Sequence, residues 1–309
     1  MKRPLTEELE MENMTQRNGF VAIVGRPNVG KSTLLNTLLG EKIAAVSRKP
    51  QTTRTAITGI LTRGGDQYVF LDTPGVHKPR TKLGSYMMKS VGTATTDVCA
   101  ILLLVEPLMQ VHPTEKELIG KFSHAGVPLI LVINKTDVHT PEEIIRTIDV
   151  FRHEADFAAV IPLSAKTGDG VEIIFEELEP FLEEGAWYFP SDMITDMPER
   201  TIAAEVIREK LLRLLDQEVP HGTAVTVEEF KETEKRIDIR AEIYCEKAGH
   251  KRIIIGKDGA MLKKIGTFAR EDLEAFFGVH VNLDLWVKVK ENWRDSDALL
   301  SAFGFGKND

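Results

Sequence analysis

Residues Gly25 to Ser32 match the pattern G-x-x-x-x-G-K-[ST], which binds the phosphates of a nucleotide. The glycines allow backbone N–H groups to turn toward phosphate oxygens, and the start of a helix behind them adds positive potential. We expect Lys31 to reach the β- and γ-phosphates and Ser32 to bind Mg²⁺. The residues predicted to line this loop are Gly25, Arg26, Pro27, Asn28, Val29, Gly30, Lys31, Ser32 and Thr33.

The elements that would position this loop stand on both sides of it. Residues 20–24 form an apolar run typical of a buried strand, and residues 33–39, stopped by Gly40, have a helical pattern. This strand–loop–helix order separates a phosphate loop from a chance glycine-rich turn.

A second motif, Asn134-Lys135-Thr136-Asp137, follows the apolar run of residues 131–133. The Asp137 carboxylate can accept hydrogen bonds from N1–H and N2–H₂ of guanine, whereas adenine has neither donor and would leave it unpaired. Lys135 can lie along the base, and Asn134 can tie this segment to the phosphate loop. These residues favour GTP over ATP.

A further base contact is predicted after the apolar run of residues 160–163. Ser164, Ala165 and Lys166 follow that run, and we expect the N–H of Ala165 to donate to guanine O6. This contact would add to the selectivity for guanine.

The last strand-end motif, Asp72-Thr73-Pro74-Gly75, follows residues 68–71. We expect Asp72 to position Mg²⁺ through water and the N–H of Gly75 to contact the γ-phosphate. Ligand sites of doubly wound sheets form at the carboxyl ends of strands, where all these motifs stand. The sequence thus predicts an α/β domain with a doubly wound, mostly parallel sheet, and it resembles a translation-factor-type P-loop GTPase.

The segment between the phosphate loop and Asp72 should hold the first switch, within residues 42–55. By similarity to GTPases with a Thr-Thr-Arg switch, Thr53 is favoured over Thr52 as the threonine that completes Mg²⁺ coordination beside the γ-phosphate. The second switch is predicted from Gly75 to about residue 90. We assign catalytic roles to Lys31, Thr53 and Gly75.

Val76 stands where many small GTPases have a Gln that orients the attacking water. A valine cannot hydrogen-bond water, so we expect slow unassisted hydrolysis. K⁺ is one candidate aid, because related GTPases use an Asn at the position of Asn28 to hold it; a simple turn-forming role for Asn28 is the alternative. Arg26 and Arg54 are candidates for an arginine finger.

The chain has 309 residues, a net charge of −8 and 42% hydrophobic residues, which fits one domain of about 170 residues and one of about 110. The two cysteines, Cys99 and Cys245, lie in strand-like patterns, so we expect them to be buried and reduced, as in a cytoplasmic protein. Apolar runs are too short for a membrane span, and residues 1–18 are a predicted tail with no secretory signal.

A change of pattern follows helices predicted at residues 113–125, 141–151 and 171–182. Residues 187–200 contain two prolines and are a predicted linker, after which a helix capped by Asp196, with Pro198 in its first turn, should begin. Alternating apolar residues predict strands at 237–245 and 281–289, with a third near 223–230. These elements belong to a second, smaller α+β domain.

Between two of these strands lies the run Ile253-Ile254-Ile255-Gly256-Lys257-Asp258-Gly259. A GxxG turn between two helices clamps about four nucleotides of single-stranded RNA. Residues 247–270 hold seven Lys and Arg against one acid, which is the charge expected of a nucleic-acid site. The residues predicted to bind RNA are Lys251, Arg252, Ile255, Gly256, Lys257, Asp258, Gly259, Lys263 and Lys264.

This second half resembles a type II KH domain, and the two halves together resemble the bacterial Era family of GTPases. The implied division is a tail at 1–18, a GTPase domain at 19–186, a linker at 187–200 and a KH domain at 201–309. The resemblance implies a ribosome-assembly GTPase that binds GTP or GDP and the 3′ end of 16S ribosomal RNA in the small (30S) subunit. It also implies peripheral contact with the inner face of the cell membrane, and we expect a monomer.

An alternative is a signalling or membrane-associated GTPase whose C-terminal domain contacts protein or anionic lipid. A tRNA-modification GTPase would normally carry an N-terminal extra domain and a C-terminal cysteine motif, neither of which is present. The GxxG frame distinguishes an RNA-binding GTPase from the signalling or membrane-associated alternative.

Overall fold

The computed structural model describes residues 15–76 and 79–305, so most of the predicted tail lies outside the described residues. The described chain forms two compact units: residues 15–41, 56–76 and 90–196 make up the N-terminal unit, and residues 42–55, 79–89 and 197–305 the C-terminal unit.

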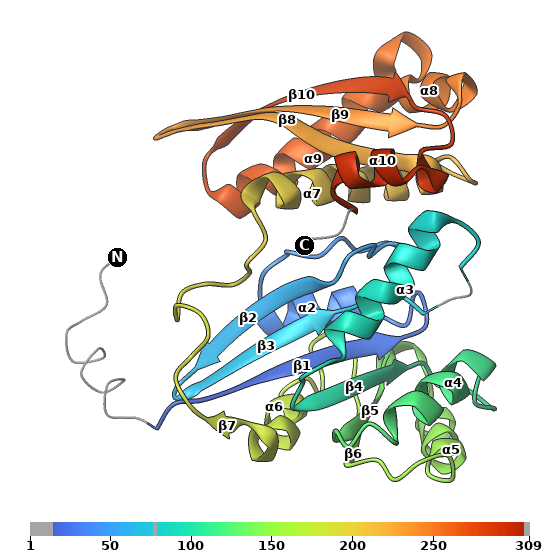
Figure 1. Cartoon of the computed structure of the whole chain (residues 1–309), viewed down its shortest axis with the longest axis vertical. Helices are drawn as coiled ribbons and strands as arrows, with labels where there is room; N and C mark the ends of the chain where they lie inside the picture. Colours follow the sequence, from blue (N-terminus) through green and yellow to red (C-terminus); the bar gives the residue numbers. More distant parts are fainter. Residues whose placement is uncertain (1–14, 77–78, 306–309) are drawn as a thin grey trace. The chain divides into compact units, whose positions relative to one another are not determined.

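The N-terminal unit is built on a sheet with strand order β2-β3-β1-β4-β5-β6, in which β2 is antiparallel and a short β7 pairs with β1 (Figure 1). The central strands β4 and β5 are buried along their whole length, as expected for a parallel sheet covered on both faces. The predicted doubly wound, mostly parallel sheet is confirmed. The strands are β1 (Arg17–Gly25), β2 (Ile57–Arg63), β3 (Asp66–Asp72), β4 (Ala100–Val105), β5 (Leu129–Ile133), β6 (Ala159–Pro162) and β7 (Glu183–Glu184).

Helices α4 and α5 pack on one face of this sheet through a continuous apolar cluster, and α2 contacts β1, β2 and β3. Both α4 and α5 begin with a proline in the first turn and a reciprocal cap, His112 with Glu115 and Thr140 with Glu143. The helices of this unit are α2 (Lys31–Leu39), α4 (Pro113–Phe122), α5 (Pro141–Phe151) and α6 (Ile173–Leu178). Helix α3 (Lys82–Ala94) belongs to the C-terminal unit up to residue 89 and to the N-terminal unit from residue 90.

Several predicted boundaries were wrong. Helix α4 ends at Phe122, and the helix expected at 171–182 is α6 followed by a 3₁₀ turn, because Pro180 lacks the N–H that a continuing helix needs. Strand β1 begins at Arg17, inside the predicted tail, where the guanidinium lies 2.7 Å from the Asp66 carboxylate on the paired strand.

The predicted linker is extended but attached to the N-terminal unit up to residue 196. The Trp187 indole N–H donates to the carbonyl of Gly65 at 2.9 Å, and the Thr195 hydroxyl donates to the carbonyl of Thr58 at 2.7 Å. Helix α7 (Glu199–Leu214) begins after Pro198, which is its N-cap; the predicted cap at Asp196 was wrong.

The C-terminal unit is a three-stranded sheet with order β10-β9-β8 and helices packed on it. Strands β8 and β9 are antiparallel, β9 and β10 parallel, as the predicted type II KH fold requires. Its remaining elements are β8 (Thr223–Thr233), β9 (Arg236–Cys245), α8 (Ala248–Ile255), α9 (Ala260–Phe277), β10 (His280–Val289) and α10 (Asp297–Leu300).

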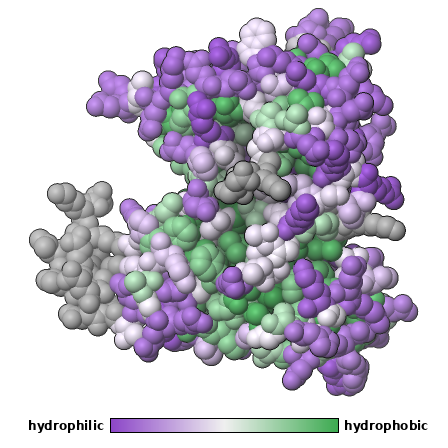
Figure 2. Space-filling view, viewed as in Figure 1, coloured by the Kyte–Doolittle hydropathy of each residue, from purple (hydrophilic) through white to green (hydrophobic). Residues whose placement is uncertain are grey.

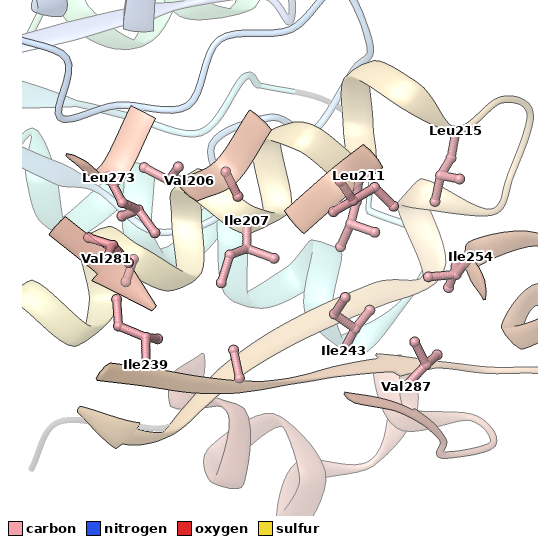
Figure 3. Packing of buried hydrophobic residues seen from close by; sticks show 14 of the residues in the cluster. Val206, Ile207, Leu211, Leu215, Ile239, Ile243, Ile254, Leu273, Val281 and Val287 are labelled. Atoms are coloured by element: carbon pink, nitrogen blue, oxygen red, sulfur yellow. The ribbon is translucent and has the colours of Figure 1, made fainter. Parts of the chain in front are cut away.

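The core of this unit joins the apolar faces of α7 and α9 to the inward residues of the strands (Figure 3). The side chains labelled there are Val206, Ile207, Leu211, Leu215, Ile239, Ile243, Ile254, Leu273, Val281 and Val287. The helices on either side of the GxxG turn are thereby fixed to a rigid sheet.

The two cysteines are free thiols, but only Cys245 is buried, since Cys99 is partly exposed. Partial burial raises the pKa of the Cys99 thiol to about 11, and burial also raises the pKa of the Cys245 thiol. Within residues 15–76 and 79–305, no helix has both the length and the apolar composition to cross a bilayer. Hydrophilic residues cover most of the outline of the C-terminal unit in the view of Figure 2.

Candidate nucleotide-binding and RNA-binding sites

The predicted phosphate loop leaves β1 at Gly25 and enters α2 at Lys31. Gly25 has a φ of 151°, and a Cβ there would lie 2.5 Å from the carbonyl oxygen of Leu104. Gly30 has a φ of 105°, and a Cβ there would lie 2.2 Å from Nδ2 of Asn134. Both positions therefore require glycine, and the loop is held close to β4 and to the Asn134 motif.

Lys31 is buried at the start of α2, where its ammonium donates to the carbonyls of Gly25 and Arg26 at 3.2 and 3.0 Å. Burial lowers the pKa of Lys31 to about 8, while the nearby Asp72 carboxylate opposes that shift. A buried ammonium at the mouth of a backbone loop is suited to bind phosphate oxygens, whose negative charge would stabilise the ammonium in place of the water that burial removes.

Asn134 links the loop to the predicted base-binding segments. Its Nδ2 donates to the carbonyl of Val29 at 2.7 Å, as the sequence predicts, and its Oδ1 accepts from the N–H of Ala165 at 2.8 Å. The N–H of Ala165 thus already has a partner inside the protein, and its predicted donation to guanine O6 would have to share or replace that bond.

The other predicted base contacts are gathered around Asp137. Its Oδ1 accepts from the Ser164 hydroxyl at 2.9 Å, and the Lys166 ammonium lies 3.8 Å from its other oxygen. Lys135, with a φ of 70°, extends toward the phosphate loop and donates to the carbonyl of Asn28 at 2.8 Å and to the carboxylate of Glu106. These side chains bring the two base motifs and the loop together.

Ser32 and Asp72, two predicted Mg²⁺ ligands, are in direct contact. The Ser32 hydroxyl donates to Oδ2 of Asp72 at 2.6 Å, and Asp72 is fully buried at the end of β3. Hydroxyl and carboxylate oxygens are the donors that Mg²⁺ prefers, so the pair fits this ion. Among the described residues there is no cluster of three or more His, Cys, Asp or Glu that could hold a metal.

The Asp72 motif also lies against the phosphate loop. The hydroxyl of Thr73 donates to the carbonyl of Ile23 at 2.8 Å, and the N–H of Val76 donates to the carbonyl of Gly25 at 3.2 Å. A Cβ on Gly75 would lie 2.7 Å from Cα of Pro27, so only glycine permits this approach. The Val76 side chain packs against the apolar core.

Thr53 is buried and belongs to the C-terminal unit, together with Thr52 and Arg54. The hydroxyl of Thr52 donates to the carbonyl of Lys49 at 2.8 Å. The choice of Thr53 over Thr52 as a Mg²⁺ ligand stays a prediction.

Both candidate arginine fingers have other partners in this structure. Arg26 pairs at 2.7 Å with Glu115, which is fully buried, and the Arg54 guanidinium donates to main-chain carbonyls of the C-terminal unit. Each would have to give up these partners before stabilising a transition state.

The predicted RNA turn joins α8 to α9, as the sequence indicates. Gly256 has a φ of 74°, and a Cβ there would lie 2.7 Å from Cβ and 2.8 Å from N of Met261. Gly259 has a φ of 78°, but a Cβ there would meet nothing within 4 Å. Gly256 is therefore needed for the fold of the turn, whereas the space beside Gly259 is open to a ligand.

The cations around this turn are exposed or half-exposed: Lys251, Arg252, Lys257, Lys263 and Lys264. None of them forms an ion pair with any residue in the part of the chain that the structure describes. Unpaired cations flanking a glycine turn are the electrostatic footprint of a backbone-phosphate site.

Two exposed apolar residues near the turn were missed from the sequence. Ile253 on α8 is 50% exposed and Phe268 on α9 is 40% exposed. Exposed apolar and aromatic surface beside a single-stranded RNA site can pack on bases. The sequence contains a signal for Phe268, which lies between Lys264 and Asp272 on one face of its helix, but none for Ile253, which stands in a run of three isoleucines.

Two protein-family models match separate parts of the chain. Residues 20–135 match the family of 50S ribosome-binding GTPases, and residues 218–294 match the KH domain family. The chain is 50% identical over 294 residues to GTPase Era of Caldanaerobacter subterraneus subsp. tengcongensis, covering 94% of this chain and 99% of that protein. It is 48% identical over 296 residues to GTPase Era of Ruminiclostridium cellulolyticum, covering 96% and 99%.

Two solved structures are similar over 94% of this chain and 100% of theirs, each at 37% identity. One is an Aquifex aeolicus Era variant bound to GDP·AlF₄⁻, with a TM-score of 0.90. The other is Era in complex with MgGDPNP and nucleotides 1506–1542 of 16S ribosomal RNA, with a TM-score of 0.89.

Proposed function

The chain belongs to the Era family of GTPases, and from this premise we propose that it binds 16S ribosomal RNA near its 3′ end and acts in assembly of the small ribosomal subunit. GTP hydrolysis itself follows from the family. The observation that carries the proposal is the GxxG turn with its unpaired cations, in a chain similar to an Era that was solved with a 16S fragment.

The residues of this chain have distinct parts in the proposed reaction. The backbone N–H groups of residues 25–32, except that Pro27 has none, and the Lys31 ammonium bind the phosphates, and Asp137 selects guanine. Ser32 and Asp72 would hold Mg²⁺, with Thr53 as a third ligand in the GTP state; when bound, the ion neutralises charge on the phosphate oxygens. Val76 cannot orient the attacking water, so activation has to come from another group.

The proposed switch couples the two halves. With GTP, Thr53 and Gly75 are ordered around the γ-phosphate, and this favours an RNA-accepting KH domain; hydrolysis releases the constraint. K⁺ held by Asn28, a monomeric state and peripheral contact with the cytoplasmic membrane face are further parts of the proposal. They are tested by turnover in K⁺ and Na⁺, by ultracentrifugation and by sedimentation with anionic vesicles.

The main test is fluorescence anisotropy of a labelled oligonucleotide from the 3′ end of 16S RNA, titrated with protein in GDP or in GDPNP. We expect a tighter complex in one nucleotide state, and weaker binding of a scrambled oligonucleotide. Lys263→Ala and Lys264→Ala should each weaken binding and reduce the salt slope by about 0.7, as for a lost contact to a single strand. Lys235→Ala is the matched control, since it removes an exposed cation from the β8–β9 hairpin of the same unit.

Equal affinity for the scrambled oligonucleotide, or equal losses in the Lys235 control, would reject the RNA site. Binding to anionic vesicles that depends on the same lysines, without RNA binding, would favour the membrane-associated alternative.

A further inference from the structure

Helix α7 buries three consecutive charged residues, Arg208, Glu209 and Lys210, which are 2%, 1% and 4% exposed. Charged side chains are almost never buried to this extent unless they have partners. Arg208 and Glu209 have partners in the switch segment, which we define as residues 42–55 and which belongs to the same compact unit, whereas Lys210 pairs with Glu209 and with Asp272 on α9. The burial of Arg208 and Glu209 therefore depends on where the switch segment lies.

The end of the switch segment beside the threonines is attached by two arginines. Arg54 is 2% exposed, donates to the carbonyls of Thr223 at 2.7 Å and His221 at 3.0 Å, and lies 5.6 Å from the ring centre of the buried Trp293. Arg208 donates to the carbonyl of Thr52 and to Glu205. Thr53 thus lies between Thr52 and Arg54, each of which is hydrogen-bonded to a residue of the C-terminal unit outside the switch segment.

The beginning of the switch segment is attached to the RNA-binding helix. The Lys42 ammonium lies 2.7 Å from Glu209 on α7 and 2.5 Å from Asp272 on α9, the helix that starts directly after Gly259. The N–H of Val46 donates to the other oxygen of Glu209 at 3.2 Å. A shift of α9 would therefore change the surroundings of Lys42.

The hydrogen bonds and ion pairs that hold the switch segment are polar contacts, and two of the nitrogen atoms in the arginines involved have no hydrogen-bond partner in the described part of the chain. Nε of Arg54 and Nη1 of Arg208 are buried without a hydrogen-bond partner among the described residues. Water could hydrate each of these polar groups if the segment moved, while the buried apolar residues Ile43, Ala44 and Ala45 of the same segment favour its packed position. The polar bonds can therefore form and break as the switch changes state, and the apolar contacts set the cost of a larger movement.

We propose that Lys42, Arg54 and Arg208 form a latch through which the position of the switch threonines and RNA binding are coupled. The latch rests on the proposed function and names the positioning residues of its switch. Ordering Thr53 around Mg²⁺ and the γ-phosphate alters the bonds of its neighbours Thr52 and Arg54. RNA bound at the GxxG turn acts on the same segment through α9 and Asp272. Because coupling is reciprocal, each ligand changes the affinity for the other by the same factor.

The test measures that factor in the full chain. The dissociation constant of the 16S 3′-end oligonucleotide is determined with GDP and with GDPNP, and those of both nucleotides with and without RNA. Lys42→Ala removes one ammonium that is 39% exposed, and Lys210 remains to pair with both carboxylates, so the fold is retained. Arg54→Lys keeps the charge but loses the double donation; its thermal unfolding is measured alongside.

We expect a wild-type ratio of about fivefold or more between the two RNA dissociation constants, falling toward one in both variants. Arg213→Ala is the matched control: it removes an exposed cation that contacts Glu209 at 3.6 Å without touching the switch segment, and its ratio should equal that of the wild type. A purely structural role would weaken RNA binding equally in both nucleotide states.

A wild-type ratio above one that both variants retain would overturn the latch alone. A wild-type ratio of one would overturn the proposed switch and the latch with it.

Discussion

Gly259→Asp separates RNA binding from folding in a way that a change at Gly256 does not. At Gly256 a new Cβ would clash with the backbone N of Met261 at 2.8 Å, and the backbone, with φ 74° and ψ 177°, is in a region that is essentially restricted to glycine. Gly256→Asp would therefore lose RNA binding whether the turn misfolds or the new carboxylate repels the RNA, and a binding measurement would not separate these two causes. At Gly259 a Cβ meets nothing within 4 Å, and its φ of 78° and ψ of 5° lie in the left-handed region that Asp and Asn tolerate best.

The matched control is Gly259→Asn, which has the same shape and backbone cost but no charge. We expect each variant to lose about 1 kcal/mol of stability from the left-handed conformation. A carboxylate about 5 to 6 Å from an RNA phosphate is repelled by about 1 to 3 kcal/mol at effective dielectric constants of about 20 to 60. Gly259→Asp should thus bind RNA roughly 5- to 100-fold more weakly than Gly259→Asn.

Anisotropy of the 16S 3′-end oligonucleotide gives the two affinities, urea unfolding gives the stabilities, and GTP turnover without RNA should be unchanged in both. Raising the salt concentration should narrow the difference, because the repulsion is screened. If both variants bound RNA equally well, the phosphate backbone would not pass over Gly259 and the placement of the RNA site would be refuted.

Four other outcomes are expected. Asp137→Asn should shift preference from GTP toward xanthosine triphosphate in nucleotide competition; retained guanine selectivity would place the base pocket elsewhere. Because burial lowers the pKa of Lys31 from 10.5 to about 8 and phosphate would raise it again, nucleotide binding should take up a proton between these pH values, as calorimetry in buffers of different ionisation enthalpy would detect. Between these two pH values the unfolded chain binds more protons than the folded chain. The free energy of unfolding of the wild type relative to Lys31→Met should therefore rise with pH, by up to about 3 kcal/mol. The absence of any pH trend would contradict the lowered pKa of Lys31. Turnover should be faster in K⁺ than in Na⁺, and Asn28→Ala should remove the difference; equal rates in the wild type would exclude the cation.

Local signals carried much of the fold prediction. Helix α5 begins and ends where the sequence predicts, because it is preceded by a threonine cap and Pro141. The motifs of the nucleotide site stand at strand ends, and in a parallel sheet those ends share one edge. Their meeting around Asn134 could thus be predicted without coordinates.

Pairings between distant residues were beyond the sequence. The hydroxyl of Thr195 finds the carbonyl of Thr58, which holds the predicted linker against β2, and nothing near either residue indicates this bond. The sequence predicts that the N–H of Ala165 donates to the guanine base, but in the folded chain this N–H donates to Oδ1 of Asn134. Such contacts depend on the packed arrangement of strands rather than on local pattern.

The charges of α7 show where pattern reasoning fails and why the failure is informative. A run of Arg208, Glu209 and Lys210 is normally the solvated side of a helix, and only partners from the switch segment and α9 make its burial possible. Replacing a buried ion pair by apolar residues is often neutral or stabilising, so such a cluster is weak evidence for stability alone. Its value in this chain lies in what an apolar contact would not offer: Arg208 and Glu209 bind the switch segment, Lys210 binds Asp272 on α9, and each charged group can be hydrated by water when it is released.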